Sequence, residues 1–181
     1  LDLLDKKPDD ARKRFEAVIS ADPKNTQALL SLAELKAANG GTPDEVTSMI
    51  GKAISASPSE PPPRLALIQY LLKQKEYKKA LAAANEAASA IQDKPEILEA
   101  LARSQQLAGD LNQAQTTYGK VASLQPTSPI PILRLAEIQF ATKNKEEGIK
   151  YLKKALEIKP DIVEVQRALI MMAMESKNTK N

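Results

Sequence analysis

The side chains that enzymes use most often for acid–base and nucleophilic chemistry are missing from this sequence. Its 181 residues include neither histidine nor cysteine. Histidine is the commonest general base and metal ligand, and the cysteine thiolate is a nucleophile, a metal ligand and the precursor of disulfides. The composition therefore excludes histidine-based catalysis, cysteine nucleophiles, disulfides and thiolate metal sites.

A glycine-containing turn is one remaining candidate for chemistry. Gly40, Gly41 and Thr42 precede an expected helix, and backbone N–H groups at a helix N-terminus can hold a phosphate. A phosphate-binding loop also needs a lysine at a fixed spacing, which this turn lacks. We therefore interpret these residues as a turn between two helices.

Paired carboxylates are a second candidate. Glu146 with Glu147, and Glu96 with Glu99, could act as a general acid and a general base. On amphipathic helices with interspersed Lys and Glu, however, such pairs are usually solvated faces. The sequence therefore predicts a protein that is not an enzyme and that uses no cofactor and no metal.

Lysine clusters are a third candidate. The densest runs from Lys73 to Lys79, and a second spans residues 143–154. Nucleic-acid binding needs a basic stripe, preferably with aromatic side chains on which bases can stack. Glutamates interrupt both clusters and the net charge is only +3, so we expect solvated faces and no nucleic-acid partner. Since no stretch of 18 apolar residues exists, we expect no direct membrane insertion by this segment.

Helices must position these residues. Apolar residues make up 43% of the chain, much of it Ala and Leu, and aromatic residues only 3%. Ala and Leu are the best helix formers, and no segment shows the sustained alternation that is typical of strands. The composition and the patterning predict an all-α fold.

An internal repeat of about 34 residues organises the chain. Four prolines, each after an Ala-rich stretch, are spaced 35, 68 and 34 residues apart: Pro23, Pro58, Pro126 and Pro160. Within each repeat, three packing positions at offsets of four and three residues fall on one face of the second helix. They hold, in order along the helix, Ala11, Val46, Ala80, Ala114 and Gly148; then Phe15, Ile50, Ala84, Tyr118 and Leu152; then Val18, Ala53, Ala87, Val121 and Ala155.

The first helix of each repeat carries a large residue followed by a small or apolar one. These pairs are Leu32-Ala33, Leu67-Ile68, Leu101-Ala102 and Leu135-Ala136. With the packing positions and the closing prolines, they resemble the tetratricopeptide repeat (TPR) family over nearly the whole chain. The resemblance implies a right-handed α-α superhelix of stacked helix-turn-helix repeats.

The repeat register divides the chain. We expect one TPR array over residues 1–181, with a partial repeat at 1–25, full repeats at 26–60, 61–94, 95–128 and 129–162, and a lone terminal helix at 163–181. Polar caps normally cover the ends of such arrays. Apolar residues at both ends indicate a fragment of a longer array: Leu1, Leu3 and Leu4, and Ile170, Met171, Met172 and Met174.

Two helix starts carry capping patterns. Thr42 is followed by Pro43 and, three positions on, by Glu45, which predicts a capping box with proline in the first helical position. Asn144 followed by Glu147 predicts a second cap of the same kind.

The TPR resemblance also implies where a partner binds. First helices line the concave groove of such arrays, and partners are usually held there. Proteins or peptides are therefore the expected partners, and the oligomeric state is left open. Carried over by repeat position, the candidate partner-binding residues are Leu30, Glu34, Leu65, Gln69, Glu99, Arg103, Leu133, Glu137, Phe140 and Arg167.

A narrower resemblance concerns short segments. Arg64-Leu65-Ala66-Leu67, Ala108-Gly109-Asp110 and Leu133-Arg134-Leu135-Ala136 are similar to the TPR-repeat lipoprotein of the PEP-CTERM/exosortase system. That resemblance implies a role in bacterial exopolysaccharide production and protein export, and a periplasmic or outer-membrane-anchored location. Two alternatives stay open, namely a cytoplasmic TPR adaptor or regulatory scaffold and the interaction module of a larger enzyme.

Overall fold

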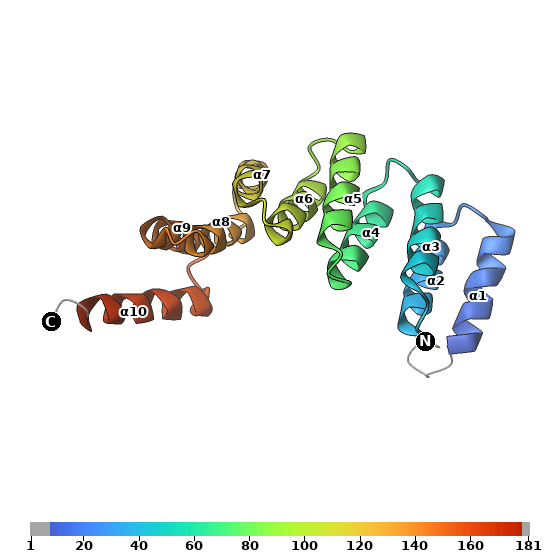
Figure 1. The fold of residues 1–181 in the computed structure, drawn as a ribbon, viewed down its shortest axis with the longest axis horizontal. Helices are drawn as coiled ribbons and strands as arrows, with labels where there is room; N and C mark the ends of the chain where they lie inside the picture. The colour runs from blue at the N-terminus through green and yellow to red at the C-terminus, as the bar shows by residue number, and fades with distance from the viewer. Residues whose placement is uncertain (1–7, 179–181) are drawn as a thin grey trace. The chain divides into compact units, whose positions relative to one another are not determined.

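Helices joined by short turns make up the protein, as a computed structural model shows (Figure 1). The structure describes residues 8–178, and within this range it contains ten helices and no strand. The prediction of an all-α fold is confirmed. The helices are α1 (Pro8–Ala21), α2 (Thr26–Ala38), α3 (Pro43–Ala56), α4 (Pro61–Lys73), α5 (Tyr77–Ala90), α6 (Pro95–Ala108), α7 (Leu111–Leu124), α8 (Ile130–Ala141), α9 (Lys145–Ile158) and α10 (Val163–Asn178).

The chain consists of two compact units. The boundary between them lies between Ala100 and Leu101, within α6. In the first unit each helix from α1 to α4 packs on the next one, and α2 also contacts α4. In the second unit, α7, α8, α9 and α10 pack consecutively. Each expected full repeat contains two helices, for example α2 and α3 within residues 26–60, and the repeat boundaries stay a prediction.

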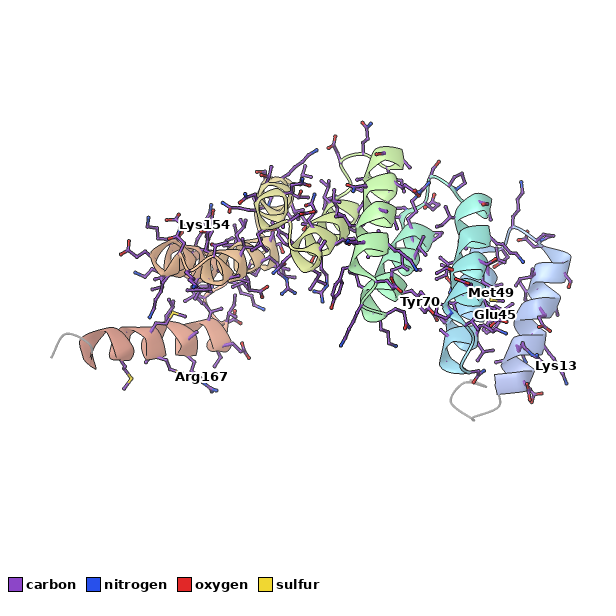
Figure 2. All side chains as sticks on the ribbon, viewed as in Figure 1. Lys13, Glu45, Met49, Tyr70, Lys154 and Arg167 are labelled. Atoms are coloured by element: carbon purple, nitrogen blue, oxygen red, sulfur yellow. The ribbon has the colours of Figure 1, made fainter. Side chains whose placement is uncertain are left out.

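The core of the first unit joins α2, α3 and α4. Ala33, Val46 and Ile50 form a buried cluster. Tyr70 of α4 is half-buried against this cluster and lies between α4 and the α2–α3 pair (Figure 2). The small residue of the pair Leu32-Ala33 therefore allows α3 and α4 to approach α2.

The core of the second unit is built around Tyr118 of α7. Its side chain is 1% exposed and lies in a cluster with Leu135 and Ile138 of α8 and Ala155 of α9. A neighbouring cluster joins α8, α9 and α10 through Ala136, Leu152 and Val165.

The packing positions predicted for the second helices are all buried in α3, α5, α7 and α9, whereas in α1 only Ala11 is buried. At the third position, Ala53 and Val121 are fully buried, whereas Val18 is 42% exposed. The prediction of a buried Val18 is wrong, because α2 is the helix on which α1 mainly packs within the described residues, and this contact leaves Val18 uncovered. Phe15 is half-buried for the same reason. The expected apolar N-terminal residues Leu1, Leu3 and Leu4 lie outside the described residues.

The first helices end in a recurrent motif with a left-handed residue. At the end of α4, the N–H of Lys75 donates to Leu72 O (3.0 Å) and the N–H of Glu76 donates to Leu71 O (2.9 Å). This pairing defines a Schellman motif, which favours glycine at its left-handed position. Glycine occupies that position after α2 and α6, but lysine does so after α4 and α8. The four residues, with their φ angles, are Gly40 (79°), Lys75 (60°), Gly109 (94°) and Lys143 (63°).

Replacing Lys75 by glycine is expected to stabilise the protein by about 0.5–1 kcal/mol. The left-handed conformation costs a residue with a Cβ atom about 1–2 kcal/mol, and the greater freedom of glycine in the unfolded chain offsets part of the gain. Urea unfolding of Lys75→Gly measures the difference. Lys78→Gly, within helix α5, is the control and should destabilise; a loss of stability in Lys75→Gly would contradict the strain argument.

The capping box at the start of α3 is confirmed. Thr42 Oγ1 accepts from the N–H of Glu45 (3.3 Å), and Glu45 Oε2 accepts from the N–H of Thr42 (2.8 Å). This backbone hydrogen bond, together with Lys36 Nζ 3.0 Å from Glu45 Oε1, lowers the pKa of the Glu45 carboxyl.

The cap predicted at Asn144 is wrong, because its side chain makes no capping hydrogen bond. Its backbone closes the Schellman motif of α8 with ψ at 69°, far from the 154° of Thr42.

Candidate binding groove

A groove of about 390 Å³ lies between α2 and α4 in the first unit, with α3 at its base. It is open because small residues line it, above all Ala33 and Ala37 from α2 and Ala66 from α4. The spacing of three and four residues places one face of each helix along the groove. The full lining is Leu30, Ala33, Glu34, Ala37 and Ala38 from α2, Val46 and Ile50 from α3, and Ala66, Gln69, Tyr70, Lys73 and Gln74 from α4 or its end.

Polar groups of the groove are available for a ligand. Glu34 and Lys73 are exposed, and neither has an ion-pair partner among the described residues. Within the same range, the Tyr70 hydroxyl has no hydrogen-bond partner, although the ring is half-buried. An apolar base with a few unpaired polar groups at its edge is the usual character of a binding site.

The structure brings three of the predicted site residues together, namely Leu30, Glu34 and Gln69. Leu65 is half-buried on α4 but does not line this groove. Glu99 and Arg103 lie on α6, where Glu99 is half-buried and Arg103 is exposed, and they also lie outside the groove.

The predicted residues of the second unit have different surroundings. Leu133 is half-buried against the core clusters of α8. Glu137 accepts from Arg134 Nη1 through both carboxylate oxygens, at 2.8 and 3.0 Å. The Phe140 ring packs over Gly148 of α9, and Arg167 is exposed on α10, where Figure 2 labels it.

Sequence reasoning missed the residues that give the groove its shape and its aromatic wall. Ala37 and Ala38 leave space at the end of α2, and Tyr70 provides the wall on α4. A signal was present, because position 37 corresponds to Leu72, Gln106 and Phe140 in the later repeats. A lone alanine among larger residues indicates where a groove opens.

The described part of the chain contains neither a metal site nor a membrane-spanning helix. Across the described residues, no three acidic, histidine or cysteine side chains gather closely enough to hold a metal ion. Of the helices within residues 8–178, none is both long and apolar enough to cross a bilayer.

Comparison with known families supports the repeat assignment. Two tetratricopeptide repeat models match the sequence, one over residues 6–61 and the other over residues 106–171. Together they cover about two thirds of the chain. The chain belongs to the tetratricopeptide repeat family. Proteins of this family are generally non-enzymatic interaction modules. No curated protein matches the sequence.

Solved TPR structures share the fold. The structure of MamA has a TM-score of 0.71 at 20% identity, covering 89% of this chain and 94% of its own. YrrB, described as a TPR protein with an unusual peptide-binding site, has a TM-score of 0.70 at 19% identity, covering 92% and 87%. The thermophilic TPR protein TTC0263 from Thermus thermophilus has a TM-score of 0.68 at 16% identity, covering 93% and 91%. At these identities the similarity shows the fold alone.

Proposed function

We propose that this TPR protein is a non-enzymatic scaffold that binds a peptide segment of a partner protein in the groove between α2 and α4. The observation that carries the proposal is the apolar base of Leu30, Ala33 and Ile50 beside the unpaired Glu34 and Lys73. Apolar side chains of the partner would supply affinity, and the two charges would select its register. The peptide-binding site of the structurally similar YrrB supports this type of function.

Filling the groove is expected to weaken peptide binding strongly. Peptides are first selected against the intact chain by phage display, and their affinities are then measured by isothermal titration calorimetry. Ala37 lines the wall of the groove, so Ala37→Trp places a large ring inside it. This substitution should weaken peptide binding at least about tenfold. Glu34→Lys should weaken it less, by about two- to fivefold, because an exposed ion pair contributes little.

The control is Lys78→Glu, an exposed position on α5 outside the groove. This charge reversal should leave the affinity unchanged. Equal losses in Lys78→Glu and Glu34→Lys, or full binding by a folded Ala37→Trp variant, would contradict the proposed groove.

The narrower proposal is that the partner belongs to the machinery of bacterial exopolysaccharide production or PEP-CTERM protein export. It is supported only by the segments that resemble the TPR lipoprotein of that system, such as Ala108-Gly109-Asp110. Mass spectrometry of the mature N-terminus of the protein, purified from fractionated cells, tests it. A lipid-modified cysteine in the outer-membrane fraction would support it. An unprocessed cytosolic protein would favour the adaptor alternative, and a fused catalytic domain would favour the enzyme-module alternative.

A further inference from the structure

A second, chemically different cleft lies in the second unit. It has a volume of about 540 Å³ and forms where the end of α8 and the following turn meet α10. Its lining is largely apolar, with Phe140, Ala168 and Met172, and with Met171, which is 58% exposed. The two charged residues of its lining are both basic, Lys143 and Lys145.

The repeat register shows that this cleft corresponds to the groove of the first unit. Ala168, Met171 and Met172 lie three 34-residue periods after Ala66, Gln69 and Tyr70. The two sites therefore occupy equivalent places on their helices, but a mixed polar lining in the first is replaced by methionines and lysines in the second. Methionine side chains are flexible and polarisable, so they adapt to differently shaped apolar partners.

Two acidic residues of α8 and α9, outside the lining of the cleft, already have partners. Glu137 holds Arg134 at 2.8 and 3.0 Å, and Glu147 Oε2 lies 2.8 Å from Lys150 Nζ, where it raises the pKa of that lysine. Glu146 is exposed and does not line the cleft. The charge of Lys143 at the edge of the cleft is therefore available to an acidic ligand.

Lys143 occupies a backbone position that is strained for any residue with a Cβ atom. Its φ of 63° is that of the left-handed residue of the α8 Schellman motif, a position that glycine occupies after α2 and α6 and that Lys75 occupies after α4. A glycine would fit the same turn without strain. The lysine adds what glycine lacks, a cation on the edge of an apolar cleft.

We propose that the α8–α10 cleft docks an acidic amphipathic segment of a partner protein. Leu- or Phe-sized side chains of that segment would lie against Phe140, Met171 and Met172, and flanking Asp or Glu residues would face the basic edge at Lys143. This docking site is separate from the α2–α4 groove, so either one can be disproved without the other.

Fluorescence anisotropy with three labelled helical peptides tests the chemistry of the cleft. The first peptide carries Leu residues three and four positions apart, on one face of a helix, and Glu residues on the flanking positions. The second peptide replaces each Glu by Lys, and the third replaces each Leu by Ala. The first should bind at least about tenfold more tightly than either of the others, because it alone matches both the apolar lining and the basic edge. Equal binding of the Lys-containing peptide would overturn the proposal.

Two matched glycine substitutions separate charge from stability. Lys143→Gly should raise Tm by a few degrees and weaken binding of the Glu–Leu peptide about two- to fivefold. Lys75→Gly, at the equivalent turn of the first unit, should raise Tm similarly and leave that binding unchanged. Lys143→Glu should weaken it about five- to tenfold. Unchanged affinity in both Lys143 variants would overturn the proposal.

Other occupants give different results. If a second copy of the chain covers the cleft, sedimentation analysis without peptide would show a dimer or larger oligomer. Met171→Asp would then abolish this self-association. If the cleft recognises a membrane surface, the protein would bind phosphatidylserine vesicles and would not bind the Glu–Leu peptide. Binding to the vesicles would depend on Lys143. Either result would overturn the assignment to an acidic protein segment.

Discussion

Tyr118→Ala is expected to lower the free energy of unfolding by about 3–5 kcal/mol. The Tyr118 side chain is 1% exposed in the core of the second unit, between α8 and the end of α6. Its removal leaves a cavity lined by Ile132, Leu135 and Ala155, in addition to the lost transfer of an aromatic ring from water. Urea denaturation followed by circular dichroism measures the change.

Tyr118→Phe is the matched control. The Tyr118 hydroxyl donates to Gln106 Oε1 at 3.3 Å, so removing it costs only about 0.5–1.5 kcal/mol. Phe15→Ala, at the equivalent position of the half-buried α1, should cost less than Tyr118→Ala. If Tyr118→Ala unfolds at the same urea concentration as the unmodified chain, the packing register described for the second unit is wrong.

Gly148→Ala is expected to destabilise the protein by about 1–3 kcal/mol, although Gly→Ala within a helix normally stabilises. A Cβ atom at Gly148 would lie 2.7 Å from Cε1 and Cζ of the Phe140 ring. The ring is packed against the cluster of Ala136, Leu152 and Val165, so it can make room only by leaving that contact. Thermal unfolding monitored by circular dichroism detects the shift in Tm.

Gly119→Ala is the control, since a Cβ atom at Gly119 of α7 would meet nothing within 4 Å. That variant should stabilise the protein by about 0.5–1 kcal/mol. Phe140→Leu combined with Gly148→Ala reproduces the residues Leu72 and Ala80 of an earlier repeat and should recover most of the lost stability. Stabilisation by Gly148→Ala alone would show that the ring does not fill this space.

The repeat period and most buried positions follow from the sequence, because each is a local pattern that recurs. Ala80, Ala114 and Val121 are buried as their repeat positions predict. The capping box at Thr42 also follows, since it depends on residues three apart along the chain. Local patterns of this kind do not depend on how distant helices meet.

Features that depend on contacts between helices were harder to predict. Val18 shares its position with buried residues, yet it is exposed because burial requires a neighbouring helix and not only the right face. The repeat position of Phe140 predicts a place on the partner-binding face, but its ring also fills the space left by Gly148. In these repeats the sizes of two facing positions compensate each other. The small Ala37 of α2 accompanies the larger Val46 of α3, and the large Phe140 of α8 accompanies Gly148 of α9. Comparing both positions together would have located the groove.

Site-specific photocrosslinking tests most directly whether the α2–α4 groove holds the partner. A photoreactive amino acid is placed at Ala37, which lines the groove, or at Lys78, which is exposed on α5 outside it. The protein is expressed in its own cells and irradiated. We expect one defined crosslinked partner from Ala37, lost when a groove-binding peptide is added, and none from Lys78. The same partner captured from Lys78 but not from Ala37 would contradict binding in the groove.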